Sequence, residues 1–121
     1  MPGVLSVLIV DDDPSMGRLM ADLVVAGGGA VCDIAGSGEA ALDTLATVSC
    51  PDLVLLDVNL PGIDGIETAH RMLARWPALR VVLTSTEALA DLPADLLDGG
   101  VSEFVPKVEL GPDRVGALLA G

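Results

Sequence analysis

Short apolar runs alternate along the chain with longer segments whose apolar residues recur every three or four positions. The runs are rich in Val, Leu and Ile, as buried strands are, and the longer segments have the period of amphipathic helices. The predicted strands cover 4–10, 30–35, 52–57, 80–85 and 102–105. The predicted helices cover 14–26, 37–48, 64–76, 87–100 and 111–121. This alternation indicates an α/β fold in which helices cover both faces of a parallel sheet.

Capping residues and prolines mark where several of these helices begin. Asp13 directly precedes a proline, as an N-cap precedes the first helical residue, and Ser37 is a suitable N-cap for the second helix. Asp64 stands three positions before a glutamate, which is the spacing of a capping box. Pro93 interrupts the fourth predicted helix, so we expect that helix to start near Pro93 or to be kinked there.

Chemically active side chains stand where the predicted strands end. In a parallel sheet the carboxyl ends of all strands lie at one edge, and functional groups gather near the point where the strand order reverses. We therefore expect these side chains to form a single site. In chain order they are Asp11, Asp12, Asp57, Thr84, Ser85 and Lys107.

The carboxylates of such a site would repel one another. Two carboxylates about 5 Å apart, at an effective dielectric constant of about 20, repel by roughly 3 kcal/mol. One lysine does not neutralise three of them, so either they take up protons or a divalent cation binds. An all-oxygen site with room for water suits Mg²⁺ or Mn²⁺. The metal would screen Asp57 so that an electrophile can approach it, which is the condition for phosphoryl transfer to a carboxylate.

Length and charge narrow the classes of function. The 121 residues suit one compact domain, which we expect to span 1–121. Six Lys and Arg against 18 Asp and Glu give a net charge of −12, which disfavours nucleic acid and anionic lipid and suits cations or basic partner surfaces. No apolar run approaches the ~20 residues of a membrane span, and the N-terminus lacks the features of a signal peptide, so we predict a cytoplasmic protein.

Three further residues have simple structural interpretations. Cys32 and Cys50 lack the spacing of metal ligands, and we interpret them as reduced thiols that pack as small hydrophobic side chains. The single histidine, His70, lies within a predicted helix beside an arginine, and we expect it at the surface.

Four segments together resemble one known family. These segments are "VLIVDDDPSMGRLM", "PDLVLLDVNLPGIDGIE", "VVLTSTEA" and "FVPK". In this order and at these spacings they resemble the response-regulator receiver domain of two-component signalling, within the CheY-like superfamily, over essentially the whole chain. The resemblance implies a flavodoxin-like (βα)₅ fold with strand order 2-1-3-4-5. It also implies that a sensor histidine kinase transfers a phosphoryl group to Asp57.

The same resemblance implies a role for each residue of the site. Asp12 would hold Mg²⁺ directly and Asp11 largely through water, while Asp57 and the backbone carbonyl of Asn59 complete the metal ligands. Lys107 would pair with the phosphoryl group.

A hydroxyl group at the end of the fourth strand would turn to bond the phosphoryl group. Ser85 lies 22 positions before Lys107, which is the family spacing, whereas Thr84 does not fit it and stays as the alternative. The two cannot both face the pocket, because successive strand residues point to opposite faces. An aromatic residue on the fifth strand, here Phe104, would turn inward with the switch.

The resemblance places the output surface on the elements at 87–100, 102–105 and 111–121, through which the domain would dimerise or bind an effector. The domain would not be an enzyme, beyond assisting its own phosphorylation and dephosphorylation. A phosphorylation-independent interaction module is the alternative function. A Mg²⁺-dependent phosphohydrolase is disfavoured, because Asn59 occupies one obvious position for its acid. The sequence leaves open whether the chain is a stand-alone receiver or the N-terminal part of a longer, DNA-binding regulator.

Overall fold

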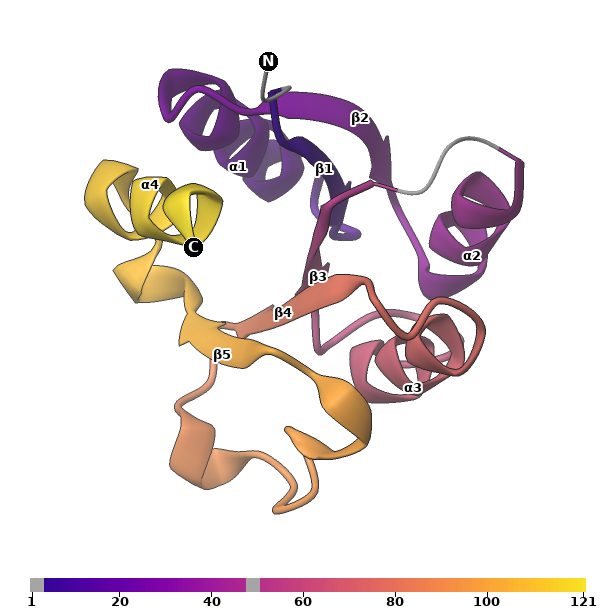
Figure 1. Ribbon diagram of the computed structural model, residues 1–121. Helices are drawn as coiled ribbons and strands as arrows, with labels where there is room; N and C mark the ends of the chain where they lie inside the picture. Colours follow the sequence, from indigo (N-terminus) through magenta and orange to yellow (C-terminus); the bar gives the residue numbers. More distant parts are fainter. Residues whose placement is uncertain (1–3, 48–50) are drawn as a thin grey trace.

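Five parallel strands form a single sheet in the order β2-β1-β3-β4-β5 (Figure 1). The computed structural model describes residues 4–47 and 51–121. The strands are β1 (Ser6–Val10), β2 (Ala30–Ala35), β3 (Leu53–Asp57), β4 (Arg80–Ser85) and β5 (Glu103–Pro106). Strand order and parallel pairing confirm the predicted α/β fold, and β3 lies at the centre of the sheet.

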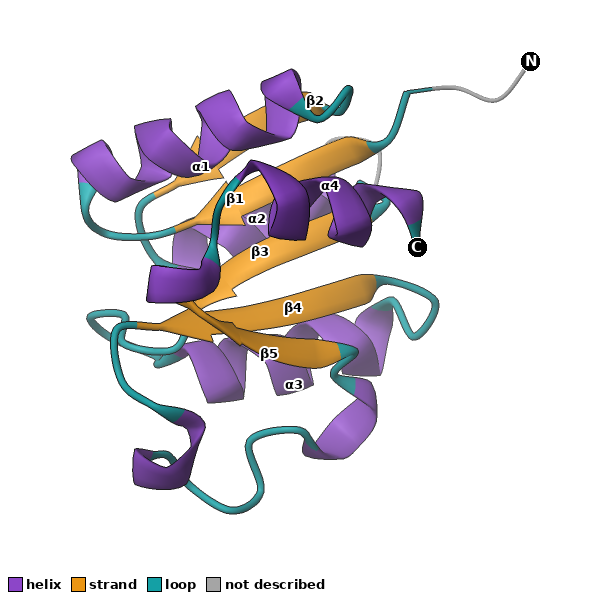
Figure 2. Cartoon of the chain, turned by 90° about the vertical axis from the view of Figure 1, so that its left-hand side faces the viewer, coloured by secondary structure: helices purple, strands orange, loops and turns teal. Residues whose placement is uncertain are grey.

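Helices cover both faces of this sheet. Within the described ranges these are α1 (Pro14–Ala26), α2 (Gly38–Thr47), α3 (Gly65–Arg75) and α4 (Pro112–Ala120). Helices α1 and α4 lie side by side on one face, and α2 and α3 cover the other (Figures 1 and 2). None of these helices is long and apolar enough to cross a membrane.

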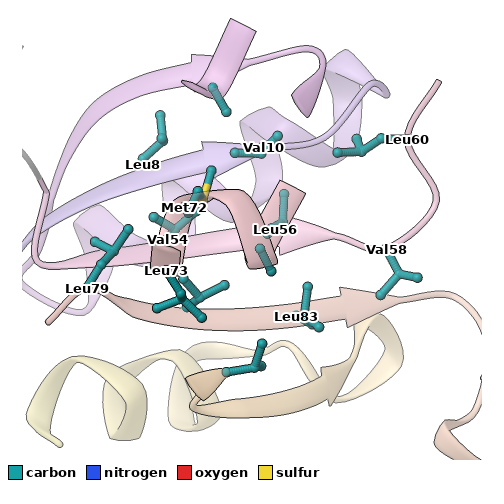
Figure 3. Close-up of a cluster of buried hydrophobic side chains, with 14 of the residues drawn as sticks. Leu8, Val10, Val54, Leu56, Val58, Leu60, Met72, Leu73, Leu79 and Leu83 are labelled. Carbon is teal, nitrogen blue, oxygen red and sulfur yellow. The ribbon is translucent and has the colours of Figure 1, made fainter. Parts of the chain in front are cut away.

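The alternating side chains of β3 supply both halves of the core. Leu53 and Leu55 pack in the cluster beneath α1 and α4, whereas Val54 and Leu56 pack in the cluster beneath α2 and α3 (Figure 3). Every residue of β3, including Asp57, is buried. A strand that is buried on both faces is held firmly, so β3 presents Asp57 at a defined position on the sheet edge.

The predicted N-caps are confirmed. The carboxylate of Asp13 accepts a hydrogen bond from the amide two residues on at 2.9 Å, and Asp64 accepts one from the amide three residues on at 2.8 Å. The hydroxyl of Ser37 likewise accepts from the amide three residues on at 3.0 Å. Each cap satisfies a helix N–H group that has no partner within the helix.

The predicted helix over 87–100 is wrong, because the structure has two short 3-10 turns there, Leu89–Asp91 and Asp98–Gly100. Pro93 has no amide hydrogen to donate, and the glycines of the second turn have φ values of +76° and +97°. The stretch between these two breaks is far shorter than the ~12–15 residues that sustain an isolated helix.

The second turn covers part of α3. A β-carbon added at Gly99 would lie 3.1 Å from Cδ2 of His70. His70 is half-buried there, so the expectation of a surface histidine is wrong. Leu96, which is 1% exposed, and Val101 anchor this stretch in the core cluster beneath α2 and α3.

Candidate functional site

Three aspartates meet at the carboxyl edge of the sheet. β1 and β3 are neighbours, and Val10 is paired with Leu56, so Asp11, just after β1, lies beside Asp57, the last residue of β3. Asp11 and Asp57 are buried, whereas Asp12 is exposed. One carboxylate oxygen of each of the three lies within 4.8 Å of the others. The sheet thus brings together three of the residues that the sequence predicted to converge.

Lys107 completes the cluster from the end of β5, where it begins a 3-10 turn, Lys107–Glu109. Its Nζ lies 2.7 Å from Oδ2 of Asp11 and 3.3 Å from Oδ2 of Asp57. Oδ2 of Asp11 accepts no hydrogen bond of good geometry from the described residues, so its partner is the charge of the ammonium group. The Lys107 side chain is 10% exposed, and a single cation therefore bridges two buried carboxylates.

Burial sets the protonation behaviour of this pair. Removal from water raises the pKa of Asp57 above its ordinary value, although an amide hydrogen bond from Asn59 and the charge of Lys107 oppose the rise. Burial by itself would lower the pKa of Lys107, but the close contact with Asp11 and the negative charges of Asp57 and Asp11 outweigh it and raise that pKa. The protonated form of Lys107 is therefore favoured, while burial disfavours the charged form of Asp57.

The second oxygens of the buried carboxylates are held by the backbone. Oδ1 of Asp11 accepts from the amide of Asp13 at 2.9 Å, and Oδ1 of Asp57 accepts from the amide of Asn59 at 3.1 Å. These bonds fix how the two carboxylates face the edge. Three carboxylates carry more negative charge than one ammonium group neutralises, and Asp12 is open to water, so these hard oxygen donors suit a divalent cation that keeps several waters.

Ser85 is connected to this edge through Asn59. The Ser85 hydroxyl accepts hydrogen bonds from Nδ2 of Asn59 at 3.2 Å and from the amide of Glu87 at 3.0 Å. Nδ2 of Asn59 also donates to Oε1 of Glu87 at 3.1 Å. Sequence reasoning missed Glu87. Its position two residues beyond the end of β4, on the edge where the other side chains gather, is the signal that could have found it.

Thr84 lies beside the site without such connections. It pairs in register with Asp57 and is fully buried, yet its hydroxyl has no hydrogen-bond partner among the described residues. Phe104 lies opposite Leu83 in the sheet and is half-buried against the core cluster beneath α2 and α3. The amide of Val58 donates to the backbone carbonyl of Thr84 at 2.9 Å, but among the two side chains it is the Ser85 hydroxyl, rather than that of Thr84, that is hydrogen-bonded to the loop that follows Asp57.

Comparison with known proteins agrees with this fold and shows the family of the chain. Residues 7–117 match the family described as the response regulator receiver domain, and the chain belongs to that family. It is 33% identical to the two-component response regulator ORR41 of Oryza sativa subsp. japonica, across 97% of this chain and 93% of that protein. Among solved structures, the response regulator domain of Thermotoga maritima CheB is similar, with 25% identity and a TM-score of 0.78 over 98% of this chain and 92% of that one.

Several relatives are much longer than this chain. The protein-glutamate methylesterase/protein-glutamine glutaminase 3 of Hahella chejuensis is 33% identical over 91% of this chain, which spans 32% of that relative. NtrX from Brucella abortus has a TM-score of 0.83 at 26% identity, and its match spans 26% of its own chain. The chain therefore corresponds to the receiver part of these relatives.

Proposed function

We propose that residues 1–121 form one receiver domain that works in the cytoplasm as a phosphorylation switch, with Asp57 as the phosphoacceptor. An oxygen of the Asp57 carboxylate would attack the phosphorus of a phosphohistidine on a sensor histidine kinase. The new P–O bond forms as the P–N bond breaks, and the electron pair of the P–N bond leaves with the imidazole. The observation that carries this proposal is the buried, backbone-oriented carboxylate of Asp57, 3.3 Å from the Lys107 ammonium group at the sheet edge.

Mg²⁺ is the cofactor that the donor set suits, with Mn²⁺ as the substitute. Asp11, Asp12 and Asp57 would hold it together with the backbone carbonyl of Asn59, Asp11 largely through water. When bound, the ion supplies positive charge that neutralises the phosphoryl oxygens. The clustering of the three carboxylates supports this assignment, since one lysine leaves them under-neutralised.

Lys107 and Ser85 would act on the phosphorylated form. Lys107 already contacts Asp57, so a small movement lets its ammonium group pair with the phosphoryl oxygens. The Ser85 hydroxyl would exchange its bonds with Asn59 and Glu87 for one to the phosphoryl group, and Phe104 would turn inward. Because residues 86–101 directly follow Ser85, this exchange would bias the conformation of the output surface on 86–101, β5 and α4, which would then engage an effector or a second copy.

Phosphate uptake tests the proposal directly. The protein is incubated with acetyl phosphate and Mg²⁺, and the phosphoprotein is resolved on a phosphate-affinity gel. We expect acid-labile phosphate on the wild type and none on Asp57→Asn. The matched control is Asp13→Asn, which removes one charge near the site and keeps a side chain able to cap α1. Uptake by Asp57→Asn at the wild-type level would overturn the assignment.

A second measurement separates this function from a phosphorylation-independent interaction module. Beryllofluoride imitates the phosphoryl group, so we expect it to shift the amide resonances of Ser85 and Phe104 only when Mg²⁺ is present. The absence of a Mg²⁺-dependent shift in the folded wild-type protein would favour the interaction module.

A further inference from the structure

The stretch between β4 and β5, residues 86–101, leaves leucine side chains in contact with water. We call it the turn segment. It encloses a groove of about 350 Å³ lined by Leu89, Leu92, Leu96 and Leu97 together with Pro93 and two alanines. Leu96 is buried, but Leu89 is 50% exposed and Leu97 is 44% exposed. Apolar surface left exposed on both sides of a groove favours contact with another molecule.

The charged residues of the turn segment are all acidic. Glu87, Asp91, Asp95 and Asp98 belong to the turn segment, and no Lys or Arg occurs between residues 81 and 106. The nearest cation in the following helix, Arg114, forms an ion pair with Glu103 of β5. The acidic side chains of the turn segment therefore have no cationic neighbour in their own part of the sequence.

Few backbone hydrogen bonds stabilise the conformation of the turn segment from within. Its internal backbone bonds span three residues each, such as Asp91 to Ala88 at 3.0 Å and Leu96 to Pro93 at 3.1 Å. Single turns of this kind lack the cooperative ladder of an α-helix, so they can adjust to a bound partner at low cost. At its start the segment is tied to the site, because the Glu87 amide donates to the Ser85 hydroxyl.

We propose that the turn segment is the docking surface for a cationic amphipathic peptide segment of an effector protein. The apolar face of the partner would fill the leucine-lined groove, and its Lys or Arg side chains would approach Asp91, Asp95 and Asp98. A second copy of this chain fits less well, since a symmetric contact would place the same acidic residues against each other. This inference rests on the proposed function, because it names the partner class of the output surface.

The test uses three fluorescently labelled synthetic peptides of equal length. One is an amphipathic helix of Leu and Lys, the second has Glu in place of Lys, and the third has Ser in place of Leu. Fluorescence anisotropy measures their affinity for the whole unphosphorylated chain at physiological salt. We expect saturable binding of the Leu and Lys peptide alone, with amide shift changes concentrated in residues 86–101. Binding of the Ser and Lys peptide with equal affinity would overturn the proposal, since net charge alone would then explain it.

Matched variants locate the surface. We expect the double change Asp91→Asn and Asp95→Asn to weaken binding at least about fivefold, the size expected from losing two exposed charge contacts. The control, Asp22→Asn with Asp43→Asn, changes the net charge equally on exposed positions of α1 and α2 and should leave the affinity within about twofold. Leu97→Ser should also weaken binding, whereas Val25→Ser, at a 61% exposed position of α1, should not. If the control variants weakened peptide binding as much as the variants of the turn segment, the proposal would be overturned.

Two further readouts keep this inference separate from the proposed function. The first is sedimentation of the free protein. If it showed a dimer that Leu97→Ser dissociates, the groove would bind a second copy of the chain, and the proposal of a cationic partner would be overturned. Peptide binding is also measured on Asp57→Asn, which is expected not to take up phosphate. Normal phosphate uptake without localised peptide binding would overturn the docking surface alone, whereas localised binding without uptake would overturn only the phosphorylation switch.

Discussion

At the scale of single residues, burial of Asp57 works against stability. The carboxylate is 4% exposed and loses hydration on folding, which is why its pKa lies above the ordinary value. A raised pKa in the folded state means that the protonated acid is the form that folding favours. The stability that folding gains from protonated Asp57 is therefore fully present below 3.8, the pKa of this group in the unfolded chain. It is lost as the pH rises through the pKa of Asp57 in the folded chain.

The first prediction concerns Asp57→Asn in metal-free buffer. We expect the variant to have a higher free energy of unfolding than the wild type at pH 7.5, because it removes a buried charge. The difference should shrink as the pH falls through the folded pKa and below 3.8, where wild-type Asp57 becomes protonated in both states. Urea unfolding in EDTA across this pH range measures the difference in the free energy of unfolding between the variant and the wild type. A difference that does not vary with pH would contradict the interpretation.

The second prediction separates the two hydroxyl residues at the end of β4. Thr84→Val removes a buried hydroxyl that has no hydrogen-bond partner in the described part of the chain, so the free energy of unfolding should rise by about 1 kcal/mol while the response to beryllofluoride is retained. Ser85→Ala removes the acceptor of two hydrogen bonds and should lower the free energy of unfolding by about 1 kcal/mol. Ser85→Ala should also diminish the response to beryllofluoride. The reverse pattern of beryllofluoride responses would assign the function to Thr84.

At the scale of elements, the start of α3 has a measurable contribution. Asp64 accepts a hydrogen bond from the amide of Glu67 at the first turn of this helix. Asp64→Ala should therefore lower the free energy of unfolding by about 1 kcal/mol. Asp43→Ala is the matched control, because it removes the same charge from an exposed position inside α2 and should cost little. Equal losses in the two variants, measured by chemical unfolding, would show that the cap contributes nothing.

The turn segment shows how one element departs from the regular pattern. Its composition favours a helix, but Pro93 and the glycines at 99 and 100 confine helical conformation to single turns. Buried leucine at position 96 still holds the segment against the sheet, so the fold tolerates the missing helix. The leucines that stay exposed among acidic residues then belong to the proposed output surface.

At the scale of the whole molecule, a net charge of −12 has two separable effects. Sodium chloride should raise the melting temperature of the wild type and of Asp12→Asn alike, because it screens repulsion spread over the surface. Millimolar Mg²⁺ at constant ionic strength should raise it further only in the wild type, where the three carboxylates are intact. Calorimetry measures both effects. A Mg²⁺ effect of equal size in Asp12→Asn would place the ion elsewhere.

Much of the fold could be predicted because its signals are local. The apolar runs of β2 and β4, the cap at Asp13 and the proline that opens α1 act within a few residues, and the structure has them where the pattern places them. The convergence of Asp11, Asp57 and Lys107 also followed from the sequence, because right-handed crossovers leave parallel strands with their carboxyl ends at one edge.

Tertiary contacts decided the rest. Whether Lys107 would lie nearer Asp11 or Asp57 depends on how β5 meets the sheet, and the 2.7 Å and 3.3 Å separations come from that packing. Glu87 joined the site through the hydrogen bond that its side chain accepts from Asn59 in the loop after β3 and through the bond that its amide donates to Ser85. The loss of the fourth helix and the partial burial of His70 reflect a balance between weak local preferences and the contacts of Leu96. The sequence by itself determined which groups reach the edge of the sheet, whereas packing between distant segments determined how those groups pair.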